Sequence, residues 1–121
     1  MANKSAVLFA VVGMAVLAAV AILAFSPGKY DSFAQCTKDS GARMYGSVEC
    51  PHCKDQKELF GKSWQYAGYV ECYAGPAGQA PECDAAGIRA YPTWVFADGS
   101  RQLGMMTFEE LSEKTGCQLP Q

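Results

Sequence analysis

The sequence predicts an α/β domain, with a mixed central sheet and helices on both of its faces, preceded by one N-terminal transmembrane helix. Two observations predict this fold class. The first is an uncharged apolar run at residues 6–25. The second is the order of patterns after that run, in which β-favouring segments alternate with helical ones and the last two strands form a hairpin. Strands separated by helices and followed by a hairpin are typical of a mixed sheet.

The apolar run Ala6–Phe25 is long enough to cross a membrane. Its 20 residues span about 30 Å as a helix, which is the thickness of a bilayer's hydrocarbon core. The alternative is a cleaved signal peptide, whose apolar region runs only about 7–15 residues. The small-residue site at 19–21 would require a cut inside the run, so we favour a retained anchor with residues 6–25 in the lipid. The sequence thus divides into an anchor (1–25), a linker (26–30) and a domain (31–121).

Six cysteines in so short a chain suit an oxidising compartment, where disulfides persist. The lysines on either side of the span, Lys4 before it and Lys29 and Lys38 after it, orient it only weakly. The cysteines therefore decide the prediction: a single-pass protein with its amino terminus in the cytoplasm and its domain extracytoplasmic, in a periplasm or lumen. The net charge of −2 and the absence of a basic stripe predict that the domain does not bind nucleic acid.

The first half of the domain contains two helices around one strand. The breaker cluster Ser26–Gly28 ends the span. A short helix is predicted at Asp31–Ser40, a strand at Ala42–Val48, and a second helix at Cys50–Phe60 that Gly61 stops. The polar residues of that second helix leave one side for the core: Cys53, Gln56, Leu59 and Phe60.

The second half is richer in strands. Tyr66–Cys72 is predicted as a strand, Tyr73–Pro81 as a loop, and Glu82–Ala86 as a helical turn. The strand Thr93–Ala97 then leads through the turn Asp98-Gly99 into a short partner strand.

A last helix is predicted from the pair Thr107 and Glu110, which have the spacing of a capping box, and it ends at Gly116.

The segment Cys50-Pro51-His52-Cys53 begins the second domain helix and carries the chemistry. Free N–H groups and the macrodipole at a helix start stabilise an anion, which favours the thiolate of Cys50. Cys53 lies one turn deeper. This asymmetry predicts that Cys50 attacks or is attacked, and that Cys53 resolves the mixed disulfide. His52 adds a hydrogen-bond donor, or a positive charge when protonated, close to the same sulfur.

Other uses of these cysteines fit less well. Haem attachment needs His directly after the second Cys, where this chain has Lys54. A zinc site would need two more ligands, and ten residues separate Cys72 from Cys83 instead of two. A purely structural disulfide in so short a loop would remove little entropy from the unfolded chain. His52 as a solvated loop residue stays an alternative. We predict no metal and no cofactor, since the chain also lacks a Gly-rich dinucleotide fingerprint.

Cys72 and Cys83 bracket a Gly- and Pro-rich segment with few apolar residues. A structural disulfide between them would limit the freedom of that segment, with two free thiols as the alternative. Cys36 and Cys117 are then left over, and a mutual bond is weakly favoured.

The domain resembles thioredoxins in the order and spacing of Lys54, the segment Gly87–Thr93, the turn Asp98-Gly99, and Gly104. The resemblance implies that Pro92, after Tyr91, is a cis-proline whose loop lies beside the active-site sulfur and binds substrate. From the sequence alone, Tyr91-Pro92 only disfavours a helix just before a strand.

The closer resemblance is to the thioredoxin-like domain fused to bacterial and plant homologues of vitamin K epoxide reductase. It covers nearly all of residues 30–116 and rests on several short motifs: Tyr45-Gly46, Cys50–Cys53, Gln56, Leu59–Lys62, Tyr69–Cys72 and Tyr91–Trp94. The resemblance implies that the domain passes disulfides between a membrane oxidase of that kind and secreted Cys-containing proteins. The Pro-His dipeptide also resembles that of DsbA, a strong oxidant.

Two departures from thioredoxins bear on the chemistry. Glu49 stands where a Trp usually precedes the first Cys, and its carboxylate would oppose the Cys50 thiolate. Met44 stands where thioredoxin has a buried Asp, so that proton relay is absent or supplied otherwise.

These observations predict a membrane-anchored thiol–disulfide oxidoreductase that oxidises extracytoplasmic proteins and is recharged by a membrane oxidase like vitamin K epoxide reductase. The alternatives are a disulfide reductase or isomerase, and a non-catalytic thioredoxin-like module for assembly or metal delivery.

Overall fold

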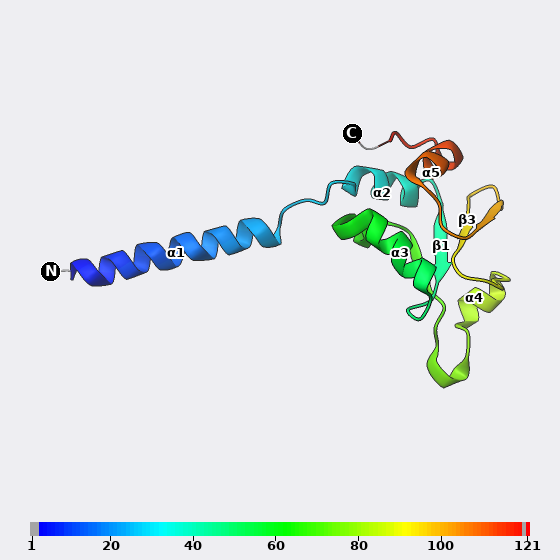
Figure 1. Cartoon of the computed structure of the whole chain (residues 1–121), viewed down its shortest axis with the longest axis horizontal. Helices are drawn as coiled ribbons and strands as arrows, with labels where there is room; N and C mark the ends of the chain where they lie inside the picture. Colours follow the sequence, from blue (N-terminus) through cyan, green and yellow to red (C-terminus); the bar gives the residue numbers. More distant parts are fainter. Residues whose placement is uncertain (1–2, 120) are drawn as a thin grey trace.

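The computed structural model describes residues 3–119 and residue 121. One long helix stands apart, and the other elements form a domain at its end (Figure 1). The helices and strands follow the chain in this order: α1 (Lys4–Ala24), α2 (Asp31–Asp39), β1 (Arg43–Gly46), α3 (Pro51–Phe60), the 3₁₀ helix η1 (Gly61–Tyr66), β2 (Tyr69–Glu71), the 3₁₀ turn η2 (Gly75–Ala77), α4 (Pro81–Ala85), β3 (Thr93–Val95), β4 (Arg101–Leu103) and α5 (Phe108–Thr115).

Helix α1 is apolar along its length and buries none of its side chains against the domain. By length and composition it is able to cross a membrane. The side chain of Asn3 caps its start by accepting a hydrogen bond from the Ser5 amide. An N-terminal helix of membrane-span length was predicted from the same residues, and the structure confirms it.

The sheet has four strands in the order β2-β1-β3-β4. Strands β1 and β2 run parallel, with Met44 opposite Tyr69. Strands β1 and β3 run antiparallel, with Met44 opposite Trp94, and β3 and β4 form the antiparallel hairpin. The predicted mixed sheet is therefore confirmed.

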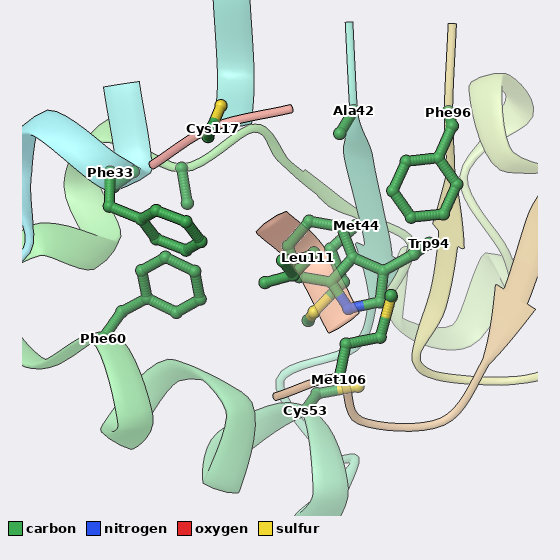
Figure 2. Close-up of a cluster of buried hydrophobic side chains, with 12 residues drawn as sticks. Phe33, Ala42, Met44, Cys53, Phe60, Trp94, Phe96, Met106, Leu111 and Cys117 are labelled. Atoms are coloured by element: carbon green, nitrogen blue, oxygen red, sulfur yellow. The ribbon is translucent and has the colours of Figure 1, made fainter. Parts of the chain in front are cut away.

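Helices cover both faces of this sheet. On one face, Met44 and Trp94 point into the main core, which α2, α3 and α5 close (Figure 2). The buried side chains of this core include Phe33 from α2, Cys53 and Phe60 from α3, and Leu111 from α5, together with Met106 and Cys117 on either side of α5. On the other face, a smaller cluster forms around Cys72, Cys83 and Ile88 beside α4. The predicted fold class is confirmed.

One local prediction about α3 differs from the structure, and one feature that follows the helix was not predicted. Leu59 was expected in the core and is 40% exposed, whereas Cys53, Gln56 and Phe60 are buried. At about 100° per residue, Leu59 lies a quarter of a turn away from Phe60 and off the buried stripe. Gly61 ends α3 as predicted, but the chain continues directly into η1, which the sequence did not predict.

Candidate active site

Three segments meet at one edge of the sheet. Cys50 follows β1, the loop after Cys72 follows β2, and Pro92 precedes β3. Because β1 and β2 are parallel and β3 is antiparallel to β1, the ends of the first two strands and the start of the third lie at the same edge. Segments far apart in the sequence are thereby brought to one side of the domain.

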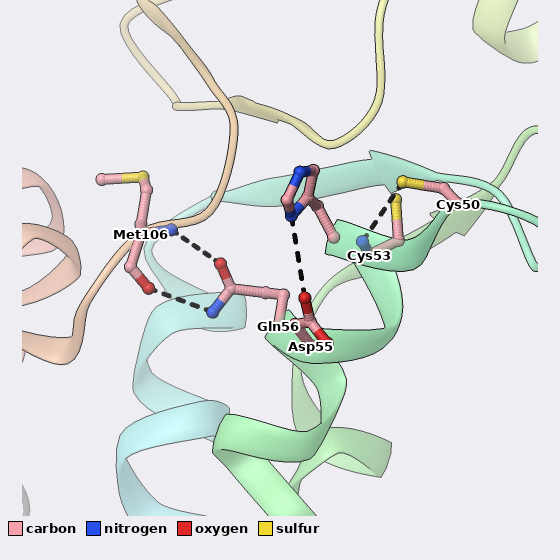
Figure 3. Close-up of polar contacts among 6 residues, drawn as sticks. Cys50, Cys53, Asp55, Gln56 and Met106 are labelled. Carbon is pink, nitrogen blue, oxygen red and sulfur yellow. Dashed lines mark hydrogen bonds and ion pairs between the residues drawn. The ribbon is translucent and has the colours of Figure 1, made fainter.

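Cys50 is the N-cap of α3, with extended backbone angles, and its Sγ accepts a hydrogen bond from the Cys53 amide at 3.2 Å (Figure 3). Pro51 occupies the first turn, where its missing N–H leaves no helical hydrogen bond unmade. Cys50 is half-buried and Cys53 has no exposed surface, and both are free thiols. This is the asymmetry that the sequence predicted for an attacking and a resolving sulfur.

Burial, followed by the hydrogen bond with Cys50, raises the pKa of the Cys53 thiol to about 12. A backbone hydrogen bond at Ser47 and the charge of Lys57 act in the opposite direction. Cys53 is therefore a neutral thiol at neutral pH, and a proton must leave or reach its sulfur whenever its bond forms or breaks.

His52 lies on the exposed side of α3, with Nδ1 3.7 Å from Oδ2 of Asp55, and both side chains are more than half exposed. Among the described residues no hydrogen bond joins His52 to Cys50. Glu49, which the sequence placed against the thiolate, has an exposed side chain. Water and salt therefore screen the carboxylate of Glu49 from the sulfur.

A pair on β2 that the sequence did not single out lies near the buried sulfur. Tyr69 Oη donates to Oε2 of Glu71 at 2.7 Å, and Lys57 Nζ lies 3.9 Å from the centre of the Tyr69 ring. Burial, followed by the hydrogen bond to Glu71, raises the pKa of Tyr69 well above its usual value. Residues two apart on a strand share a face, so the sequence held a signal for this pair.

Glu71 also holds the chain that leads into Cys50. Its Oε1 accepts hydrogen bonds from the amides of Val48 at 3.2 Å and Tyr73 at 2.8 Å. Burial pushes its pKa upward, but the hydrogen bonds from Tyr69 and the two amides outweigh that effect and lower it. A single carboxylate thus ties the segment before the first cysteine to the loop that follows β2.

Tyr91 and Pro92 are joined by a cis peptide bond, and Pro92 is buried. Tyr91 Oη donates to Oε1 of Gln79, and Gln79 Nε2 donates to the Ile88 carbonyl at 3.1 Å. The Pro92 carbonyl accepts from the Gly104 amide at 2.8 Å. The proline loop is therefore held on one side by the loop after β2 and on the other by the segment after β4.

Gln56, one turn beyond Cys53, fixes that second segment to α3. Its amide group donates to the Met106 carbonyl at 3.0 Å and accepts from the Met106 amide at 2.7 Å (Figure 3). The sequence placed Gln56 on the core side of α3 but gave no sign of this partner, which lies 50 residues away.

The other four cysteines form two disulfides in the structure. One joins Cys72 to Cys83 and ties the end of β2 to α4. The second joins Cys36 on α2 to Cys117 after α5, 81 residues apart. Within residues 3–119 and 121, no cluster of three or more His, Cys, Asp or Glu side chains is arranged to hold a metal ion.

No known family model matches the chain. The chain is similar to the thiol-disulfide oxidoreductase LTO1 of Arabidopsis thaliana, with 37% identity over 86 residues. The match covers 67% of this chain but 23% of that protein, so the chain spans less than a quarter of its relative's length.

Proposed function

We propose that this chain is a thiol–disulfide oxidoreductase that works through Cys50 and Cys53. One observation carries the proposal: a half-exposed free Cys50 caps α3, a buried free Cys53 lies one turn inside, and cis-Pro92 belongs to the same edge of the sheet. The similarity to a thiol-disulfide oxidoreductase supports the same activity.

The proposed direction is oxidation of client proteins. A client thiolate attacks Sγ of Cys50 in the Cys50–Cys53 disulfide, that bond breaks, and the electron pair leaves on Cys53, which takes up a proton. A second client thiolate attacks the client sulfur of the mixed disulfide and releases Cys50. Two electrons have then passed from the client dithiol to the pair, and the client holds a disulfide.

The reduction potential of the Cys50/Cys53 couple tests the direction of electron flow. A value near that of DsbA, about −120 mV, means an oxidant, and one near that of thioredoxin, about −270 mV, means a reductase. It is measured by equilibrating the full-length protein in detergent with glutathione buffers and counting alkylated Cys50 by mass spectrometry.

The proposed setting is extracytoplasmic, with α1 as a single-pass anchor whose residues 6–25 lie in the lipid. Four of the six cysteines are paired, which supports an oxidising compartment. Protease added to intact spheroplasts should digest the domain. Full protection of the domain would place it in the cytoplasm.

The proposed recharging partner is a separate membrane oxidase like vitamin K epoxide reductase, and the proposed clients are secreted or periplasmic Cys-containing proteins. Anchoring enzyme and oxidase in one membrane raises their effective concentration. Cys53→Ala removes the resolving thiol, so mixed disulfides through Cys50 should persist long enough for mass spectrometry. Adducts with a multi-span oxidase and several clients support the proposal. Adducts only with an electron-importing membrane reductase would mean that electrons flow in the opposite direction. If a folded variant with a reactive Cys50 gives no adducts, a non-catalytic module is favoured.

A further inference from the structure

The segment that leads from α1 into the domain is fastened to the domain. The Gly28 amide donates to Oδ2 of Asp31 at 2.8 Å, and the Tyr30 amide donates to Oγ of Ser63 at 2.9 Å. Ser63 belongs to η1 and is 1% exposed. From Gly28 onward the chain is therefore part of the folded domain.

This attachment is closely packed. A Cβ atom on Gly28 would overlap the Ser63 hydroxyl and the Asp31 carboxylate, and would stand 3.0 Å from the Ser63 amide nitrogen. The Tyr30 ring packs edge-on against Phe108 with 4.7 Å between ring centres. Swinging this segment away from the domain would break these contacts together.

Only Phe25, Ser26 and Pro27 lie between the end of α1 and Gly28. The four chain steps from Ala24 to Gly28 reach at most about 14 Å when fully extended. Ser26 shortens this reach, because its Oγ donates back to the Ile22 carbonyl at 2.7 Å. A headgroup layer is about 5–8 Å thick on each side of the hydrocarbon core. If α1 fills that core, η1 lies in or just above the headgroups.

The side chains that η1 and its neighbours expose suit such a layer. Tyr66 is 38% exposed and Leu59 40% exposed, and Phe25, which lines a pocket together with Gln65 and Tyr66, is 86% exposed. A tyrosine places an apolar ring and a polar hydroxyl across a membrane interface, and a lysine such as Lys62 extends its amine to water.

Four charges close to this surface along the chain cancel: Lys62 and the exposed Glu58 lie on either side of Leu59, and the exposed Lys29 lies two residues before the half-buried Asp31. The matching partner is therefore a zwitterionic lipid surface, and anionic lipid is not required.

We propose that the surface formed by Leu59, Lys62, Gln65 and Tyr66, named here the η1 surface, rests on the headgroup layer and holds Cys50 away from the membrane. Helix α3 begins directly after its N-cap Cys50 and ends at η1, and its 10 residues span about 15 Å. Figure 1 shows the η1 end of α3 nearer to α1 and the other end farther away. The inference rests on the membrane anchor of the proposed function.

Amine labelling of the full-length chain in phosphatidylcholine nanodiscs tests this orientation. Lys62 lies on the η1 surface, whereas the exposed Lys54 lies near Cys50 and serves as the internal reference. Their acetylation rates are measured by mass spectrometry, in the natural chain and in a variant with ten Gly and Ser residues inserted between Ser26 and Pro27. A surface docked for about 80–90% of the time reacts about five- to tenfold more slowly. We expect that ratio for Lys62 in the natural chain and its loss in the insertion variant.

A pair of tyrosine variants separates lipid contact from linker length. Tyr66→Asp should restore Lys62 labelling without changing the linker. Tyr73→Asp, at a tyrosine 45% exposed beyond β2, should leave the labelling ratio as in the natural chain. Equal Lys62 rates in the natural and insertion chains would overturn the orientation. If Lys62 is unprotected in both chains, the surface does not dock. If Lys62 is protected in both, the protection comes from a second copy of the chain.

Two further readouts separate this inference from the proposed function. Flotation with vesicles reports the anchor, and client oxidation in detergent reports the Cys50/Cys53 chemistry. Failure of the chain to float with the vesicles would contradict both the membrane anchor and the proposed orientation. If the chain floats and oxidises clients but Lys62 is unprotected, only the proposed orientation is contradicted.

Discussion

Gly46, the last residue of β1, lies against the sulfur of Cys53. A Cβ atom built on Gly46 would stand 2.9 Å from Cys53 Sγ and 3.0 Å from a ring carbon of Tyr69. Real Cβ atoms do not approach sulfur that closely, so a glycine at this point of the strand gives the buried thiol its space.

Gly46→Ala should therefore displace the resolving sulfur without changing the attacking one. Overpacking of this kind should lower the free energy of unfolding by about 1–3 kcal/mol. A displacement approaching 1 Å should slow resolution of the mixed disulfide by about 10- to 100-fold. Quenched-flow trapping of the adduct between the reduced protein and a model disulfide, which Cys53 resolves, measures that rate, and alkylation of Cys50 serves as the control. Unchanged resolution would mean that the sulfur keeps its position.

The reduced protein should alkylate at Cys50 and leave Cys53 intact over the physiological range. With the pKa of Cys53 raised to about 12, its thiolate fraction at pH 8 is about one in ten thousand. Iodoacetamide labelling from pH 6 to pH 10, followed by peptide mass spectrometry, checks this. In guanidinium chloride both thiols should label alike. Faster labelling of Cys53 in the folded protein would reverse the two roles.

Glu71→Gln should destabilise the domain at neutral pH and have little effect in acid. The substitution weakens the hydrogen bonds from Tyr69, Val48 and Tyr73, at a cost of about 1–2 kcal/mol. Because folding lowers the pKa of Glu71, the stability it adds is complete above its unfolded pKa and is lost as the pH falls through its folded pKa.

Urea unfolding of the natural protein and the Glu71→Gln variant, at pH 7 and pH 3 in detergent, measures this difference. Glu58→Gln, at an exposed position, is the control and should change stability by less than about 0.5 kcal/mol. A difference between the natural protein and Glu71→Gln that persists undiminished at pH 3 would contradict the assigned role of the carboxylate.

The two disulfides should differ in what their removal costs. The Cys72–Cys83 bond closes a short ring and the Cys36–Cys117 bond a long one, with separations of 11 and 81 residues. Loop-closure entropy assigns about 3 kcal/mol to the first and about 4.5 kcal/mol to the second. Urea unfolding of the two double Cys→Ala variants compares them, after non-reducing peptide mapping of the natural protein. An exchange of partners in that map would contradict both pairings.

The sequence predicted those parts of the fold that rest on local signals. Thr107 and Glu110 form the capping box of α5, with hydrogen bonds in both directions. The turn at Asp98-Gly99 joins β3 to β4, and Gly61 ends α3 at a positive φ. Each of these features depends on residues only a few positions apart, so its signal can be recognised in the sequence without knowledge of the tertiary structure.

The parts that could not be predicted depend on distant partners. Glu71 holds the amide of Val48, 23 residues earlier, and Gln56 holds Met106, 50 residues later. Leu59 was misplaced because the direction of the buried stripe on α3 depends on what η1 and the sheet present to it. The position of Cys50 and Cys53 at the start of α3 was predicted because the spacing of the two cysteines around Pro51 is itself a local signal.

The bond between Cys36 and Cys117 makes most of the domain a closed covalent ring. A protease that cuts one peptide bond inside this ring opens the chain but frees neither fragment, because the sulfur bridge still joins them. A nicked molecule therefore keeps the fragment that carries Cys50 and Cys53 attached to α2 and to everything that precedes it. Release of either fragment requires a second cut or a reductant. The disulfide therefore keeps the domain in one covalent piece after a single cleavage, which the packing of its small core alone would not do.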